Sequence, residues 1–340
     1  MRRTGLYLLA LLAGLLAPAA ISMAAEVNIY SYRKEALIRP QLEAFSKATG
    51  ISYNLITGSS GGLLQRLKNE GRNSPADVLL TVDAGRLHRA LEMGLLQPIR
   101  SPVLEATIPA RFRDPAGHWF GLGIRARAIF YNSKTIKPSD LSSYEALADA
   151  KWKGRILIRS SSNIYNQSLL ASMIHHNGKQ KALAWARAIV ANLARRPQGG
   201  DRDQLRAAAA GEGDIAIANS YYYARLLNSK KPADRKVTDI VKPFWPNQAG
   251  RGTHVNVSGG GVTAHAPNKA SAIRLLEFMV TPEAQRIYAE IGNELPVRQG
   301  VKLSPVVAGM GSFKMDAMPL RILGENNAQA VRLFDRAGWR

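Results

Sequence analysis

The first part of the chain alternates between two hydrophobic periods. Every-second-residue apolar patterns predict strands, and apolar residues spaced three and four apart predict helices. These patterns place strands and helices in turn at residues 27–32, 36–48, 51–56, 63–70, 76–82 and 84–93. A small polar loop, Thr57–Gly62, joins the second strand to the second helix. Strands and helices in this succession are typical of a parallel sheet covered by helices.

A second α/β unit follows an extended segment. In residues 124–131, Arg125 and Arg127 alternate with apolar residues, which predicts a crossover strand. Further elements are predicted at 155–158, 167–176, 181–193, 214–218, from Tyr221, and at 255–264, 270–279, 282–291, 317–323 and 326–337. We therefore predict an α/β protein with two lobes, lobe 1 from residues 25–124 and 252–300 and lobe 2 from 125–251 and 301–340. Binding sites in such proteins lie in a cleft at the carboxyl ends of strands.

The amino terminus has the pattern of a secretory signal peptide over residues 1–24. Arg2 and Arg3 precede an apolar stretch, and small residues precede Ala25. The apolar stretch is short, so we expect cleavage and no stable membrane anchor. The chain has no cysteine, which excludes disulfides and a lipid on an N-terminal thiol. We expect a monomer, free in the periplasm of a bacterium with two membranes.

The chain is strongly basic, with 46 Lys and Arg against 25 Asp and Glu. Residues 1–24 contribute two arginines and no acid, so the remainder carries a net charge of +19. This charge suits polyanions, and a surface that binds them with steep salt dependence is one hypothesis. However, the basic residues are dispersed, and no zinc-finger or helix-turn-helix spacing occurs. We therefore expect no nucleic-acid partner.

Three consecutive tyrosines follow the predicted strand at 214–218. Asn219 and Ser220 form a plausible helix N-cap, so Tyr221 and Tyr222 fall in the first turn, and Tyr223 is expected to point into packing. Tyr165 lies in another strand-to-helix loop of the same lobe. Aromatic packing is one explanation for such tyrosines. Oxygen ligation of a hard cation is the other.

Ferric ion suits a phenolate site by charge. Ionising one phenol at pH 7 costs about 4 kcal/mol, or roughly 12 kcal/mol for three. A trivalent cation offsets this cost by coordination, whereas a divalent ion does so poorly. We predict metal ligation by Tyr165, Tyr221 and Tyr222.

Three phenolates leave coordination positions open, which a bidentate anion such as carbonate can fill. Arginine side chains and helix-end amides bind such anions. Arg33 and Arg125 are the candidate arginines. Ser59, Ser60 and Gly61 are the candidates for backbone N–H donors.

Several stretches together resemble the periplasmic ferric-ion-binding proteins of bacterial ABC iron importers. They are VNIYSYR from Val27, SPADVLLTVD from Ser74, WFGLGIRA from Trp119, NIYNQS from Asn163, PQGGDRDQ from Pro197, NSYYY from Asn219 and residues 282–296. The resemblance implies a two-lobed type II periplasmic binding protein that closes over Fe³⁺ with a synergistic anion. It also implies delivery to an inner-membrane permease and its ATPase. By the resemblance, Tyr165, Tyr221 and Tyr222 bind iron and Arg33 contacts the anion.

The chain departs from this family at two positions. Where other members supply a histidine and an acidic residue from the first lobe, this chain has Lys34 and Val82. We therefore expect the second lobe to hold most of the iron's coordination, with the first lobe contributing charge and an anion.

Catalytic motifs are missing from the sequence. It has no zinc-protease spacing, nucleophile elbow, P-loop or complete dinucleotide fingerprint. We expect a binding protein and no enzyme. The alternative is a metal-independent binder of a small anion such as phosphate or a phosphonate.

Overall fold

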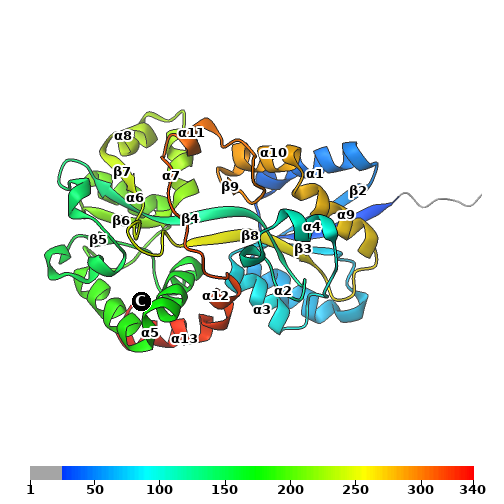
Figure 1. Ribbon diagram of the computed structural model, residues 1–340, viewed down its shortest axis with the longest axis horizontal. Helices are drawn as coiled ribbons and strands as arrows, with labels where there is room; N and C mark the ends of the chain where they lie inside the picture. Colours follow the sequence, from blue (N-terminus) through cyan, green and yellow to red (C-terminus); the bar gives the residue numbers. More distant parts are fainter. Residues whose placement is uncertain (1–24) are drawn as a thin grey trace, which may run out of the picture.

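A mixed β-sheet runs through the whole molecule. The computed structural model describes residues 25–340, so the predicted signal peptide lies outside the described residues. Within that range, the strand order is β2-β1-β3-β8-β4-β6-β5, with β7 and β9 also paired to β4 (Figure 1). The strands are β1 (Glu26–Ser31), β2 (Ser52–Thr57), β3 (Val78–Val82), β4 (Phe120–Asn132), β5 (Ile156–Leu157), β6 (Ile215–Asn219), β7 (Val241–Phe244), β8 (Val255–Val262) and β9 (Leu295–Pro296).

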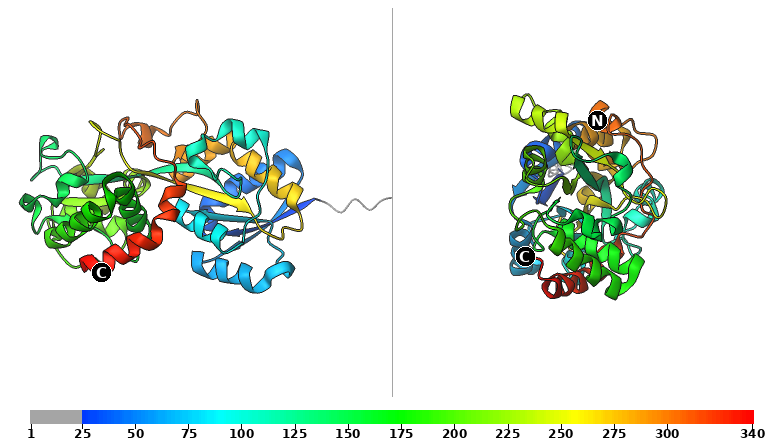
Figure 2. Two further views of the ribbon diagram at one scale, coloured as in Figure 1. Left: turned by 60° about the horizontal axis from the view of Figure 1, so that its bottom comes forward. Right: turned by 90° about the vertical axis from the view of Figure 1, so that its left-hand side faces the viewer.

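Helices pack around this sheet and complete two lobes. They are α1 (Glu35–Thr49), α2 (Ser60–Glu70), α3 (Ala84–Glu92), α4 (Pro102–Thr107), α5 (Ile164–Asn192), α6 (Asp201–Ala210), α7 (Ser220–Leu227), α8 (Pro232–Ile240), α9 (Lys269–Met279), α10 (Pro282–Gly292), α11 (Pro305–Ala308), α12 (Arg321–Glu325) and α13 (Asn327–Ala337). The first lobe carries β1–β3 and the second carries β5–β7, and Figure 2 shows the two bodies side by side. This confirms the predicted two-lobed α/β fold.

Two long strands join the lobes. The first half of β4 pairs with β8, and its second half, from Arg127 to Tyr131, pairs with β6. Both strands cross the middle of the molecule in Figure 1. The crossover predicted at residues 124–131 is therefore confirmed. Arg125 and Arg127 consequently lie where the two lobes meet.

The second lobe contains elements that the sequence patterns did not predict. Helices α6 and α8 were missed, although the alanine run at the end of α6 favours a helix. The predicted helices at 167–176 and 181–193 form one element, α5, with a kink at Gly178. The helix predicted at 317–323 begins only at Arg321, because the N–H of Leu320 bonds to the carbonyl of Arg111 and Pro319 has no N–H to donate.

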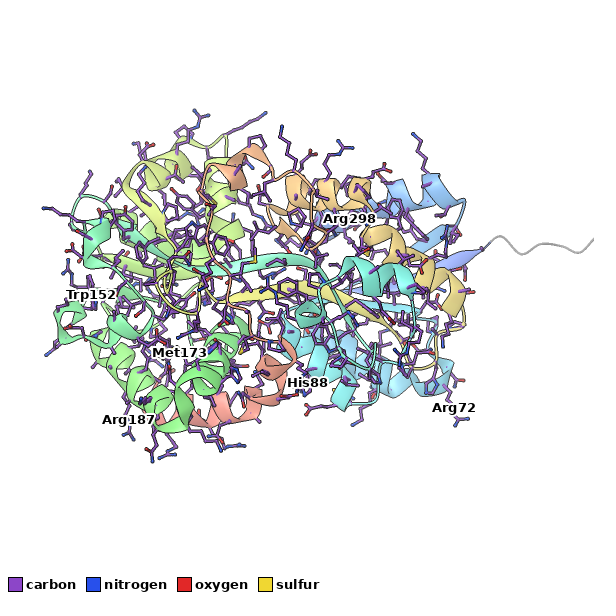
Figure 3. The ribbon with its side chains drawn as sticks, viewed as in Figure 1. Arg72, His88, Trp152, Met173, Arg187 and Arg298 are labelled. Carbon is purple, nitrogen blue, oxygen red and sulfur yellow. The ribbon has the colours of Figure 1, made fainter. Side chains whose placement is uncertain are left out.

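The carboxyl-terminal helices contact both lobes. Helix α13 packs against α5, and α12 packs against α3. At the second contact, a Cβ atom on Gly324 would clash with the side chain of His88, which Figure 3 labels. None of the helices described in residues 25–340 is long and apolar enough to span a membrane.

Candidate functional site

A cavity of about 260 Å³ lies where the lobes meet. Its wall contains tyrosines, cationic side chains and one carboxylate. The lining residues are Tyr32, Arg33, Lys34, Leu37, Val82, Arg125, Tyr165, Tyr221, Tyr222, Arg225 and Glu294. The first lobe, the crossover strand and the second lobe all contribute. The cavity thus brings together five of the predicted site residues.

The tyrosines reach the cavity from the first turns of two helices. Strand β6 runs directly into α7, so Tyr221 and Tyr222 follow the strand end at once. Their rings pack with centroids 4.2 Å apart. Tyr165 lies in the first turn of α5, where its N–H donates to the side chain of the N-cap residue Asn163. The Tyr221 hydroxyl donates to the Tyr165 hydroxyl at 3.2 Å, so two phenol oxygens from separate helices meet.

Tyr223 points away from this cavity. Its hydroxyl donates to the carbonyl of Val241 at 2.8 Å, and its ring packs against Phe130. The expectation that Tyr223 serves packing is therefore confirmed.

The two deeper phenols resist ionisation. Burial raises the pKa of Tyr165 to about 12, although the positive charge of Arg125 partly opposes this rise. Burial and the neighbouring Tyr165 raise the pKa of Tyr221 well above its ordinary value. Both are neutral at pH 7 without a cation. A ligand that ionises them has to be strongly positive.

A buried carboxylate joins the two predicted anion-binding arginines. Glu294 Oε1 accepts from Arg33 Nη1 and from Arg125 Nη2, each at 2.9 Å. The Ser258 hydroxyl accepts from both arginines and donates to Glu294 Oε2 at 2.8 Å. Arg33 also donates to the hydroxyl of Tyr288. Part of the donor capacity of Arg33 and Arg125 is thus already used within the protein.

These charges stabilise one another in the ionised state. Burial opposes ionisation of Glu294, but Arg125 and Arg33 outweigh it and lower its pKa. Burial also opposes the charge on Arg33, yet Tyr288 and Glu294 raise its pKa. The same balance, with Glu294 as the main partner, raises the pKa of Arg125. Both guanidinium groups and the carboxylate therefore stay charged at neutral pH.

Among the cavity residues that the sequence patterns missed are two charged ones, Glu294 and Arg225. Arg225 lies one helical turn after Tyr221, and its guanidinium carbon is 5.0 Å from the centre of that ring. The i,i+4 spacing was the signal that places both on one face of α7. Glu294 is separated by 261 residues from Arg33, and no local pattern marks that contact.

The three residues predicted to bind the anion through backbone N–H groups lie outside the cavity wall. In the described part of the chain, the cavity wall does not include Ser59, Ser60 or Gly61. The Ser59 hydroxyl instead caps α2 by accepting from the N–H of Gly62. Lys34 and Val82 do line the cavity, but neither supplies a good iron ligand. No group of three His, Cys, Asp or Glu side chains within residues 25–340 is arranged to hold a metal.

Known proteins match this chain along nearly its whole length. The family described as bacterial extracellular solute-binding protein matches residues 41–315. Iron uptake protein A1 of Synechocystis is 50% identical over 93% of this chain and 88% of its own length.

Solved structures give the same grouping. A Trichodesmium protein in complex with iron and citrate ligands is 53% identical, with a TM-score of 0.91 over 93% of this chain and 100% of its own. The ferric binding protein from Campylobacter jejuni is 42% identical, with a TM-score of 0.87 over 92% of this chain and 100% of its own. The protein thus belongs to the bacterial extracellular solute-binding proteins, where it groups with iron uptake and ferric-binding proteins.

Proposed function

We propose that this protein captures ferric iron in the periplasm with the phenolates of Tyr165, Tyr221 and Tyr222. Arg33 and Arg125 hold a synergistic anion beside the ion, and the loaded protein delivers it to an inner-membrane ABC permease and its ATPase. One observation carries the proposal: three phenols from two helix starts line one cavity, with two of their oxygens 3.2 Å apart. Hard oxygen donors gathered this closely suit a hard cation.

The charges of the cavity favour an anion beside the iron. Arg33, Lys34, Arg125 and Arg225 are cationic, and Glu294 is the one carboxylate in the wall formed by the described residues. A ferric ion with three phenolates adds no net charge. The wall therefore keeps a positive excess that a carbonate or a carboxylate-rich chelator can balance.

The relatives support this assignment. Iron uptake and ferric binding are named for the relatives above, and the Trichodesmium complex holds iron and citrate. We propose carbonate as the synergistic anion, and citrate is the alternative that the Trichodesmium complex suggests.

A metal-independent anion binder is the second candidate. The observation that favours it is the cluster of cationic side chains in the cavity wall. Against it, an anion bound without metal gives no reason for three phenols to gather in the same wall, two of them with oxygens 3.2 Å apart.

A visible absorption titration separates the two candidates. Chelator-stripped protein is titrated with ferric citrate in bicarbonate buffer, and Tyr222→Phe and Tyr223→Phe are compared with the wild type. We expect a broad phenolate-to-iron band that saturates at one iron per chain. The band should weaken in Tyr222→Phe and remain in Tyr223→Phe, since Tyr223 bonds to Val241 outside the cavity.

A different pair of results would favour the metal-independent anion binder. No band in the wild type, combined with a rise in melting temperature on adding phosphate or a phosphonate, would replace the ferric assignment with anion binding.

A further inference from the structure

A buried arginine connects the two segments that carry the tyrosines. Arg127 lies on β4 and is 1% exposed. Its Nη2 donates to Asn166 Oδ1 at 2.6 Å, and its Nη1 donates to Asn219 Oδ1 at 3.0 Å. Asn166 directly follows Tyr165, and Asn219 stands two residues before Tyr221. One guanidinium group thus bonds to both tyrosine-bearing segments.

The side chains of Asn219 and Asn166 both accept hydrogen bonds from Arg127. Asn219 is the N-cap of α7, but its side chain makes no hydrogen bond to the helix. Its Oδ1 accepts from Arg127 instead. Asn166 Nδ2 donates to the carbonyls of Arg159 and Ser160, which ties the loop before α5 to the same point.

Further contacts hold Arg127 itself in place. Its Nη1 lies 3.2 Å from Asp201 Oδ1, and this carboxylate is also buried. The backbone N–H of Arg127 donates to the carbonyl of His254 at 3.1 Å, and the hydroxyl of Tyr144 donates to the backbone carbonyl of Arg127. A buried ion pair gives little net stability compared with apolar packing. Stability alone is therefore a poor explanation for this arginine.

From this geometry we infer that Arg127 is a positioning residue for the phenolate site, an inference that rests on the proposed function. Iron binding converts Tyr165 and Tyr221 into neighbouring like charges, which repel each other unless the metal and a rigid backbone hold them. The planar guanidinium donates to two amide oxygens and a carboxylate together. A lysine keeps the charge but lacks this fork. Arg127 fixes the spacing of the two phenol oxygens before iron arrives.

The test compares Arg127→Lys with the wild type and with Arg155→Lys. Arg155 forms an ion pair with Asp214 in the same lobe, outside the cavity wall. Each protein is loaded with ferric citrate in bicarbonate, and the visible band and the rate of iron release to a chelator are measured. We expect Arg127→Lys to shift the band and to release iron about 10 to 100-fold faster. Arg155→Lys should match the wild type.

Two further variants keep the test decisive if Arg127→Lys does not fold. Asn166→Ala and Asn219→Ala each remove one acceptor and leave the Arg127–Asp201 pair in place. We expect each to change the band and the release rate in the same direction. Their effects should combine non-additively in the double variant.

Failure of the inference differs from failure of the proposed function. A wild-type protein that shows no band on adding iron overturns both. A wild-type band with unchanged band position and release rate in folded Arg127→Lys overturns the inference alone, even if the melting temperature falls. If Arg127→Lys does not fold, unchanged spectra and rates in both asparagine variants overturn it equally.

Discussion

At the scale of single residues, the proposed iron ligands Tyr165 and Tyr221 are neutral phenols in the iron-free protein. The pKa of Tyr165, raised to about 12 by burial, implies that ionising it at pH 7 costs about 7 kcal/mol. Tyr221 is buried beside it, and burial raises its pKa well above its ordinary value. Ferric ion has to displace these protons, and this couples iron binding to pH.

Iron affinity should therefore fall as the pH falls. The iron-free protein holds a proton on Tyr165 and on Tyr221, because burial raises the pKa of both phenols, and ligation of iron by these two groups removes both protons. Each pH unit lost between pH 8 and pH 5 then weakens binding by about a hundredfold through these two phenols. Competition against a chelator, corrected for the chelator's own protonation, measures this slope. An affinity independent of pH over this range would contradict phenolate ligation.

Glu294 is the second residue with a strong expected effect. Glu294→Gln leaves Arg33 and Arg125 buried and uncompensated, and we expect the unfolding free energy of the iron-free protein to drop by about 3–5 kcal/mol. Urea unfolding at pH 7 measures it. Because the folded pKa of Glu294 is lowered, its contribution is present above its ordinary pKa and is lost as the pH falls through the lowered one.

An exposed ion pair provides the matched control. Glu325→Gln breaks the surface pair with Arg321 and should cost less than about 1 kcal/mol. Bicarbonate or citrate should restore more stability to Glu294→Gln than to the wild type, since an anion can replace the lost carboxylate. Equal stability of Glu294→Gln and the wild type would contradict the proposed charge balance.

At the scale of elements, the kink in α5 depends on one glycine. Gly178 has φ 78° and ψ 162°, a region that residues with a side chain rarely adopt. A Cβ atom at this position would meet no other atom within 4 Å, so the cost of Gly178→Ala is conformational. We expect a loss of about 1–3 kcal/mol in unfolding free energy. Gly61→Ala, in helix α2 with open space around it, should be neutral or stabilising. Equal effects of the two variants would contradict this account.

Elements with a local signal were predictable from the sequence, and contacts between distant residues were not. Periodicity located β1–β3, the crossover β4 and most helices, because each has its apolar face in a continuous stretch. The tyrosines were visible because Tyr221 and Tyr222 are adjacent and Tyr165 lies in a strand-to-helix loop just before a predicted helix. The Glu294 pairs with Arg33 and Arg125 depend on the folding of segments 261 and 169 residues apart. Such pairs have no signature in one sequence.

At the scale of the whole molecule, the positive charge extends beyond the cavity. Arg72 and Arg187 are exposed at opposite ends of the molecule (Figure 3), and the part from residue 25 onward has a net charge of +19. A field of this sign attracts anionic cargo such as ferric citrate and raises its association rate.

The association rate of ferric citrate should consequently depend on salt. Raising the ionic strength from about 0.01 to 0.15 M shortens the screening length from about 30 to 8 Å. We expect the rate to fall on the order of tenfold in stopped-flow measurements. Lys34→Gln, in the cavity wall, should lower the rate at low salt more than Arg187→Gln, which changes an exposed residue of α5 outside the cavity wall. A rate that is insensitive to salt would argue against steering.

The most direct test of the whole account is an anomalous difference map at the iron absorption edge. Crystals are grown from stripped protein loaded with one ferric ion per chain in bicarbonate. We predict one strong peak within bonding distance of the phenol oxygens of Tyr165, Tyr221 and Tyr222, with anion density between the iron and Arg33 or Arg125. A peak away from these oxygens, in crystals that contain one iron per chain, would contradict the proposed site.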